Sequence, residues 1–144
     1  MGALQLEEPA PRYASAAAVD THQMGAAGLR AFARISQAWG LTVDEQLALL
    51  GQPPRSTYFA WRKQPDKAAL ARDTLERLSN LLGIYKSLQM LLPDAQAADA
   101  WVRRPNTAPL FGGRSALDRM LAGNVADLNL VRRYLDGVRG GGWS

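Results

Sequence analysis

The sequence of 144 residues contains no cysteine and a single histidine, His22. The absence of cysteine excludes disulfide bonds, thiolate nucleophiles and cysteine-based zinc sites, and one imidazole supplies too few ligands for most transition-metal sites. A serine–histidine–aspartate triad would have to use His22, which lies in a polar stretch outside any predicted packed element. No Walker loop is present, and no pair of carboxylates stands out from the helical background. We therefore predict that the chain is not an enzyme and uses no metal or other cofactor.

Long hydrophobic runs are also absent. No stretch reaches the roughly 18 consecutive apolar residues that a membrane-spanning helix needs. No signal peptide is recognisable over residues 1–20, and we expect a cytoplasmic protein without a membrane partner. With 47% hydrophobic and 21% charged residues, the composition is that of a globular protein and excludes disorder throughout.

The basic charge is unevenly distributed along the chain. Residues 1–66 contain six basic and six acidic side chains, whereas residues 67–144 contain eleven basic and seven acidic ones and so account for the whole net charge of +4. A protein that reads nucleic acid usually concentrates its basic side chains on the reading element. Here the excess of basic side chains lies in residues 67–144.

The predicted fold class is all-α, because apolar residues recur at intervals of three and four and no strand pattern is found. The predicted architecture is an N-terminal helix-turn-helix bundle with a long dimerisation helix, followed by a small helical domain. We place a flexible N-terminal arm at residues 1–22, the helix-turn-helix and dimerisation domain at residues 23–92, and the small helical domain at residues 93–144.

Residues 42–63 have the form of a helix-turn-helix. A helix over residues 24–39 precedes this unit, and Thr42 with Glu45 forms a capping box that begins a second short helix. After a proline-containing turn, Ser56 is the predicted N-cap of a third helix. In such a unit the second helix offers its N-terminal residues to DNA. The candidate DNA contacts are Arg55, Ser56, Thr57, Tyr58 and Arg62.

Two features of this unit have an alternative interpretation. The three helices could form an ordinary bundle in which the last helix is only structural, because this half of the chain has no net charge and DNA affinity depends on neutralising phosphates. A group of aromatic side chains could stack on bases, but at helical spacing we favour a place in the core. This group consists of Trp39, Tyr58, Phe59 and Trp61.

The longest predicted helix covers residues 67–92 and is apolar on two sides. In so short a chain, a second copy of the protein is a plausible cover for the second side, and we therefore predict a homodimer. Gly83 lies in the middle of this helix, where glycine costs about 1 kcal/mol relative to alanine. A close backbone crossing would explain it.

The C-terminal third is the most distinctive part of the sequence. A predicted helix ends at Trp101, a proline-flanked loop leads into a glycine pair, and two short helices follow. The motif reads Trp101-Val102-x-x-Pro105-Asn106, then residues 109–118 as Pro-Leu-Phe-Gly-Gly-Arg-Ser-Ala-Leu-Asp, then a helix with Val131, Leu135 and Val138. This pattern resembles the toxin-binding domain of Xre/ParS/MbcA-type antitoxins, and more weakly the Xre-like helical domain upstream of it. Phe111 and Ala116 depart from the family pattern without removing the motif.

The resemblance implies an antitoxin of a type II toxin–antitoxin system. Its expected partner is a cognate RES-domain toxin that consumes NAD or ADP-ribosylates a target, neutralised when the C-terminal domain covers the NAD pocket. Operator DNA would be a second partner if the protein represses its own operon. Arginines outside the apolar stripe of the last helix, and a tryptophan beyond three glycines, suit such contacts. The candidate toxin-binding residues are Asn106, Phe111, Arg114, Arg132, Arg133, Arg139 and Trp143.

Another function remains open. The chain could be a stand-alone helix-turn-helix transcriptional repressor whose C-terminal domain only dimerises or senses a ligand. A neighbouring reading frame that encodes a small toxin would favour the antitoxin. Specific operator binding without a protein partner would favour the repressor.

Overall fold

The computed structural model describes the backbone of residues 9–140 and the side chains of residues 21–140. Within this part the predicted all-α fold is confirmed, since the structure contains helices and one isolated bridge between Pro105 and Ser115. In chain order the elements are α2 (Pro9–Ala38), α3 (Val43–Leu49), α4 (Arg55–Lys63), η1 (Pro65–Lys67), α5 (Arg72–Leu91), α6 (Ala95–Ala100), η2 (Trp101–Arg103), α7 (Ala116–Met120) and α8 (Val125–Arg139).

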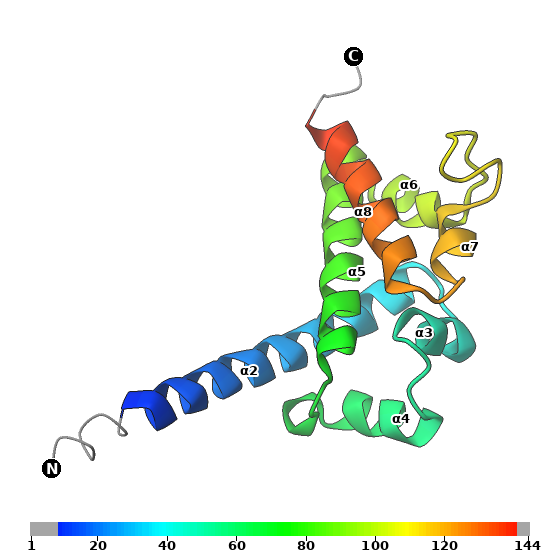
Figure 1. Ribbon diagram of the computed structural model, residues 1–144. Coiled ribbons are helices and arrows are strands. Elements are labelled where there is room, and N and C mark those ends of the chain that lie inside the picture. The colour runs from blue at the N-terminus through cyan, green and yellow to red at the C-terminus, as the bar shows by residue number, and fades with distance from the viewer. Residues whose placement is uncertain (1–8, 141–144) are drawn as a thin grey trace, which may run out of the picture.

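The first helix starts earlier than expected. The arm predicted over residues 1–22 is helical from Pro9 onward, and the N-terminal part of α2 projects from the rest of the molecule (Figure 1). Proline fits the first turn of a helix, where its missing N–H has no partner to lose, and the alanine-rich stretch that follows has high helix propensity. Gly40, with a φ of 62°, terminates α2 close to the predicted helix end at residue 39.

Helix α5 is central to the fold. It packs against α2 on one side and against α8 on another (Figure 1). Its buried apolar side chains are Leu78, Leu81, Ile84 and Leu88. Because α8 of the same chain covers the second apolar side, the expectation that a second copy must cover it is wrong. The helix also starts at Arg72 rather than Lys67, since residues 68–71 are not helical and connect η1 to α5.

The crossing of α5 and α8 explains Gly83, though not by the close backbone contact expected. A Cβ atom at Gly83 would lie 2.5 Å from Nε of Arg132, so the guanidinium of this α8 residue occupies the space. Arg132 there donates a hydrogen bond to the backbone oxygen of Ser79 at 3.1 Å. The missing side chain therefore makes room for an arginine.

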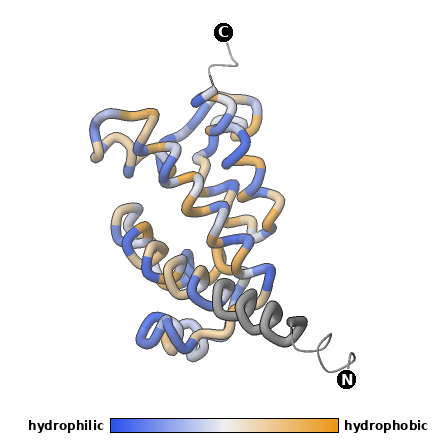
Figure 2. Tube along the Cα trace, turned by 90° about the vertical axis from the view of Figure 1, so that its left-hand side faces the viewer, coloured by the Kyte–Doolittle hydropathy of each residue, from blue (hydrophilic) through white to orange (hydrophobic). Residues whose placement is uncertain are grey.

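One hydrophobic core runs through both halves of the chain. Trp39 and Phe32 are buried in the first half, Val102 and Leu128 in the second, and α5 contributes to both. Hydrophilic and hydrophobic residues alternate along the helices (Figure 2), and no described helix is long and apolar enough to cross a membrane. The two halves are thus packed together as parts of one folded unit.

Candidate functional site

The helix-turn-helix geometry is formed by α3, a turn and α4. The predicted capping box at the start of α3 is confirmed, because the Glu45 amide donates to Oγ1 of Thr42 and the Thr42 amide donates to Oε1 of Glu45. The prediction that Ser56 is an N-cap is wrong, since α4 begins at Arg55 and Pro54 takes the N-cap position. Proline fixes its own φ and favours the start of a helix, so the proline pair sets this boundary.

Tyr58 belongs to the core and not to the exposed face of α4. It is 1% exposed, and its hydroxyl donates to Oε1 of Gln46 at 2.6 Å. Burial raises the pKa of the Tyr58 hydroxyl, although the nearby charge of Arg62 opposes the shift. In this position Tyr58 cannot reach a base edge, and the core interpretation holds for Tyr58 and Trp39. Phe59, by contrast, is 42% exposed on the outer face of α4.

The other candidate DNA contacts lie on the surface of α4 to different degrees. Ser56 is exposed, and Thr57 is half-buried. Arg55 is exposed but forms an ion pair with Asp44 of α3 at 2.6 Å. Arg62 is exposed and lies over the Tyr58 ring, 5.9 Å from its centroid. The structure therefore leaves four of the five candidates at the surface, one of them with a competing carboxylate.

The loop of residues 104–115 is held together by its own backbone and by Asn106. The Asn106 amide donates to the Arg114 oxygen, the Gly113 amide donates to the Asn106 oxygen, and Oδ1 of Asn106 accepts from the Ala108 amide. Gly112 and Gly113 have φ values of 58° and 87°, which other residues rarely adopt, so this turn requires the glycine pair. Asn106 consequently shapes the loop from within.

Phe111 anchors the same loop to the core. It is 5% exposed, and its ring meets those of Trp101 and Tyr134 edge-on, with centroids 5.9 and 5.3 Å away. Such pairs add about 0.5–1.5 kcal/mol beyond the area they bury. Phe111 therefore has little surface to offer a partner, in contrast to Arg114, whose side chain is 79% exposed.

Sequence reasoning missed Arg119, which braces the loop. Its guanidinium donates to the Leu110 oxygen at 3.1 Å and to the Asp127 carboxylate at 2.9 Å. The loop, α7 and the start of α8 enclose an open hollow of about 410 Å³, bordered by Arg114, Asp118 and Arg119. No local sequence pattern marks Arg119, because its partners lie nine residues before it and eight after it.

The arginines of α8 differ in whether their side chains are bound by the rest of the protein. Arg132 is bound to Ser79, and Arg139 donates to Oγ of Ser87 at 3.2 Å, so both lie along α5. Arg133 is exposed and makes no ion pair or hydrogen bond with the described residues. Trp143 lies outside the described residues. Of the predicted toxin contacts, the structure therefore presents Arg114 and Arg133 most openly.

A second residue missed by sequence reasoning, Arg103, ties the two halves together. It donates to the backbone oxygens of Trp39 and Gly40 and to Oε1 of Glu45, each at 2.9 Å. Burial raises the pKa of the Glu45 carboxyl, but hydrogen bonds from Thr42 and Arg103 and the charge of Arg103 outweigh it, and the pKa falls below its ordinary value. This contact joins the end of α2 and the start of α3 to the residue just before the 104–115 loop.

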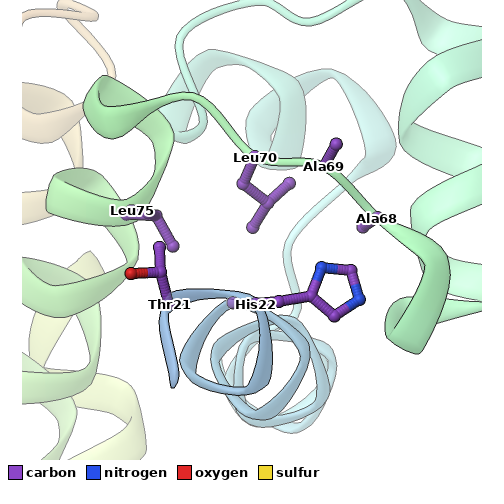
Figure 3. A pocket seen from close by; sticks show the side chains of 7 residues that line it. Thr21, His22, Ala68, Ala69, Leu70 and Leu75 are labelled. Carbon is purple, nitrogen blue, oxygen red and sulfur yellow. The ribbon is translucent and has the colours of Figure 1, made fainter. Parts of the chain in front are cut away.

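A separate, mostly apolar pocket of about 340 Å³ lies between α2 and the segment that leads into α5 (Figure 3). Thr21 and His22 of α2 line one side, and Leu70 and Leu75 line the other. His22 contacts the backbone oxygen of Asp66. No group of three or more potential metal ligands occurs among the described residues. The pocket therefore offers apolar surface and little polar chemistry.

These features define a class: a helix-turn-helix protein joined through a common core to a second helical domain with an exposed, internally braced loop. The comparisons with known proteins agree. The family model for the antitoxin Xre-like helix-turn-helix domain matches residues 18–83, and the model for the antitoxin Xre/MbcA/ParS C-terminal toxin-binding domain matches residues 87–141. The uncharacterized protein y4oB of Sinorhizobium fredii (strain NBRC 101917 / NGR234) is 50% identical over 115 residues, covering 80% of this chain and 86% of the relative.

The chain belongs to the Xre/MbcA/ParS antitoxin family. It is an antitoxin of a toxin–antitoxin system, with an N-terminal helix-turn-helix and a C-terminal toxin-binding domain. The resemblance inferred from residues 101–138 is thereby confirmed.

Proposed function

We propose that the protein neutralises a RES-domain toxin by covering its NAD pocket with the C-terminal domain. The observation that carries this proposal is the braced loop of residues 104–115, which keeps Arg114 exposed beside an open hollow. Arg133 adds a second exposed guanidinium, which makes no ion pair or hydrogen bond with the described residues. Guanidinium groups pair well with carboxylates, and carboxylates that position NAD would be left without countercharge by an inhibitor that lacks cations.

Growth rescue in cells that express a neighbouring RES-domain protein tests the proposal. The double variant R114E/R133E should rescue at least tenfold less well than the natural protein, because two attractive contacts become repulsive. The double variant K67E/R72E makes the same charge change at exposed positions outside the toxin-binding domain and should rescue normally. Equal rescue by both variants would contradict the proposed surface, and absence of any rescue by the natural protein would contradict the RES partner.

Truncation after Val138 examines the tail separately. It removes Arg139 and Trp143 but leaves the buried residues of α8, so we expect a folded protein that rescues growth poorly. Full rescue by the truncated chain would move the inhibitory surface to residues 105–118 and to the exposed residues of α8. Circular dichroism of the truncated chain controls for folding.

We propose that the helix-turn-helix binds the operator of its own operon. The support is the exposed outer face of α4, with Arg55, Ser56 and Arg62. The double variant R55A/R62A should weaken operator binding and leave toxin neutralisation intact, because the two surfaces lie on different elements. Operator binding without any protein partner would instead favour the stand-alone repressor. For the antitoxin and for the stand-alone repressor alike, we propose a protein that is not an enzyme, needs no cofactor and acts in the cytoplasm.

We propose a homodimer whose contact is the base of the projecting part of α2. Met24 is 71% exposed there, and the flanking residues His22 and Gly25 line the apolar pocket of Figure 3. Helix-turn-helix proteins commonly bind two half-sites as dimers. Light scattering should give twice the chain mass of 15.7 kDa, and M24E should give the monomer, whereas M90E, at another exposed methionine, should not. A monomeric natural protein would contradict the proposal.

A further inference from the structure

A groove on the helix-turn-helix unit has positive charge and no negative charge. It lies between α2 and α4, measures about 360 Å³, and is lined among others by Arg34, Ser36, Gln37, Leu41, Gln46 and Arg62. None of its lining residues is a carboxylate. Two guanidinium groups from different helices therefore border one depression in the surface.

The two arginines of the groove differ from their neighbours in having no anionic partner. Arg30, one turn before Arg34 on α2, is paired with Asp66 at 2.5 Å, and Arg55 on α4 is paired with Asp44. Arg34 makes no hydrogen bond or ion pair with any described residue, and Arg62 only lies over the Tyr58 ring. An anion that enters the groove would not have to displace a carboxylate.

The floor of the groove is polar and fixed. The Gln46 side chain donates to the Leu41 oxygen at 3.0 Å and accepts from Tyr58, so its orientation is set. Oγ of Ser36 is buried and has no hydrogen-bond partner among the described residues. A buried hydroxyl without a partner is uncommon in a folded protein, and Ser36 adds a polar group to the lining of the groove.

The position of the groove relates it to the outer face of α4. Arg62 lies on the side of this face that is turned toward α2, and α4 lies at the end of the molecule opposite the C-terminus of α8 (Figure 1). In helix-turn-helix complexes the second helix enters the major groove, and the elements beside it meet the sugar–phosphate backbone. A duplex placed against α4 would bring its phosphates to the α2 side.

We infer that this groove holds a backbone phosphate of duplex DNA between Arg34 and Arg62, and that Arg34 is a DNA contact although it lies outside the helix-turn-helix segment. The inference rests on the proposed operator binding. Arginine donates two parallel hydrogen bonds to phosphate oxygens, and two arginines on separate helices can grip one phosphate from both sides. Such a contact fixes the position of α4 on the duplex and carries no sequence information of its own.

Fluorescence anisotropy over a series of KCl concentrations tests the inference, with the duplex immediately upstream of the coding sequence and a shuffled duplex as probes. R34Q should bind both duplexes on the order of fivefold more weakly and lower the slope of log affinity against log salt by about 1. R72Q removes the same charge from an exposed position outside the groove and should change the slope little. R34K, which keeps the charge but not the fork of donors, should fall between R34Q and the natural protein.

The outcomes separate the groove from operator binding as such. If the natural protein binds neither duplex, the proposed operator binding fails and the groove inference fails with it. If R55A weakens binding while R34Q does not, operator binding stands and the groove inference is overturned. Equal losses in R34Q and R72Q would also overturn it, because they would show a long-range charge effect only. Thermal melts should be unchanged in R34Q, since Arg34 is exposed and makes no contact that supports the fold.

Discussion

The two halves of the chain differ in net charge, yet both contain arginines bound by the protein and arginines without carboxylate partners. The second half contains the entire net charge of +4, yet five of its arginines donate hydrogen bonds to the protein's own oxygens. These five are Arg77, Arg103, Arg119, Arg132 and Arg139. The first half has no net charge, yet it leaves Arg34 and Arg62 without carboxylate partners. Net charge along the sequence therefore does not tell which cations a partner can reach.

The difference follows from which backbone oxygens lie within reach of each arginine. Helix ends and loops leave oxygens without partners inside the element, and a side chain with five donors can satisfy several of them at once. Arg103 does this for Trp39 and Gly40 at the end of α2, and Arg119 does it for Leu110 in the 104–115 loop. Arg34 lies within α2, where the helix satisfies its own backbone groups, and its side chain stays available.

The largest expected effect tests whether the two halves share one core. L88E places a charge at a site that is 1% exposed between α5 and α8, and we expect a loss on the order of 4 kcal/mol or more, enough to unfold the chain. M90E, on the same helix at 60% exposure, should change stability by less than about 0.5 kcal/mol. Hydrogen exchange should show both halves of L88E unprotected, whereas a protected first half would mean that it folds alone.

A smaller effect is expected where an arginine is committed to the fold. R119M leaves the Leu110 oxygen and the largely buried Asp127 carboxylate without their donor, which should cost about 2–3 kcal/mol. R114M removes an exposed arginine whose ion pair with Asp118 is long, with 3.9 Å between nitrogen and oxygen. This substitution should cost less than about 0.5 kcal/mol of stability. Urea unfolding measures both. Similar losses in the two variants would contradict the distinction between committed and available arginines.

A double-mutant cycle at Gly83 probes the same distinction on α5. Alanine at this position gains up to about 1 kcal/mol in helix propensity, but its Cβ forces the Arg132 guanidinium away from Ser79. We therefore expect G83A to be nearly neutral in the natural protein and stabilising by about 1 kcal/mol in the R132A background. Thermal unfolding of the four proteins measures the difference, and equal effects in both backgrounds would show that Arg132 moves aside without cost.

The sequence predicts those parts of the fold whose signals are local. The capping box at Thr42 forms as expected, because it involves residues three apart on one chain segment. The capping box at Ser115 and the N-cap at Asp94 are local in the same way. The apolar stripe of α8 is also confirmed for its buried members. The helix pattern predicts that α5 starts at Lys67, but residues 68–71 connect η1 to the helix, which starts at Arg72.

The sequence does not predict contacts between distant segments. Arg103 reaches residues about sixty positions earlier in the chain, and Arg132 fills the space above Gly83 from another helix. The motif makes Phe111 a candidate toxin contact, but two aromatic rings brought near by the fold help to bury it. For the candidate sites, residue type and motif are thus a guide to location, while availability depends on tertiary partners.

The smallest expected effect concerns Arg103, which is half-exposed and joins the halves through Glu45. Because the Glu45 pKa is lowered in the folded protein, its ionised form stabilises the fold above the ordinary pKa of a glutamate, and this contribution is lost as the pH falls through the lowered value. R103M should therefore cost more at pH 7 than at pH 3, with the difference, about 0.5 kcal/mol after solvent screening, appearing between roughly pH 5 and pH 3. The loss that persists at pH 3 belongs to the carbonyls of Trp39 and Gly40, which do not titrate. In the E45Q background the cost of R103M should be the same at every pH, so a pH-dependent cost there would place the partner of Arg103 elsewhere.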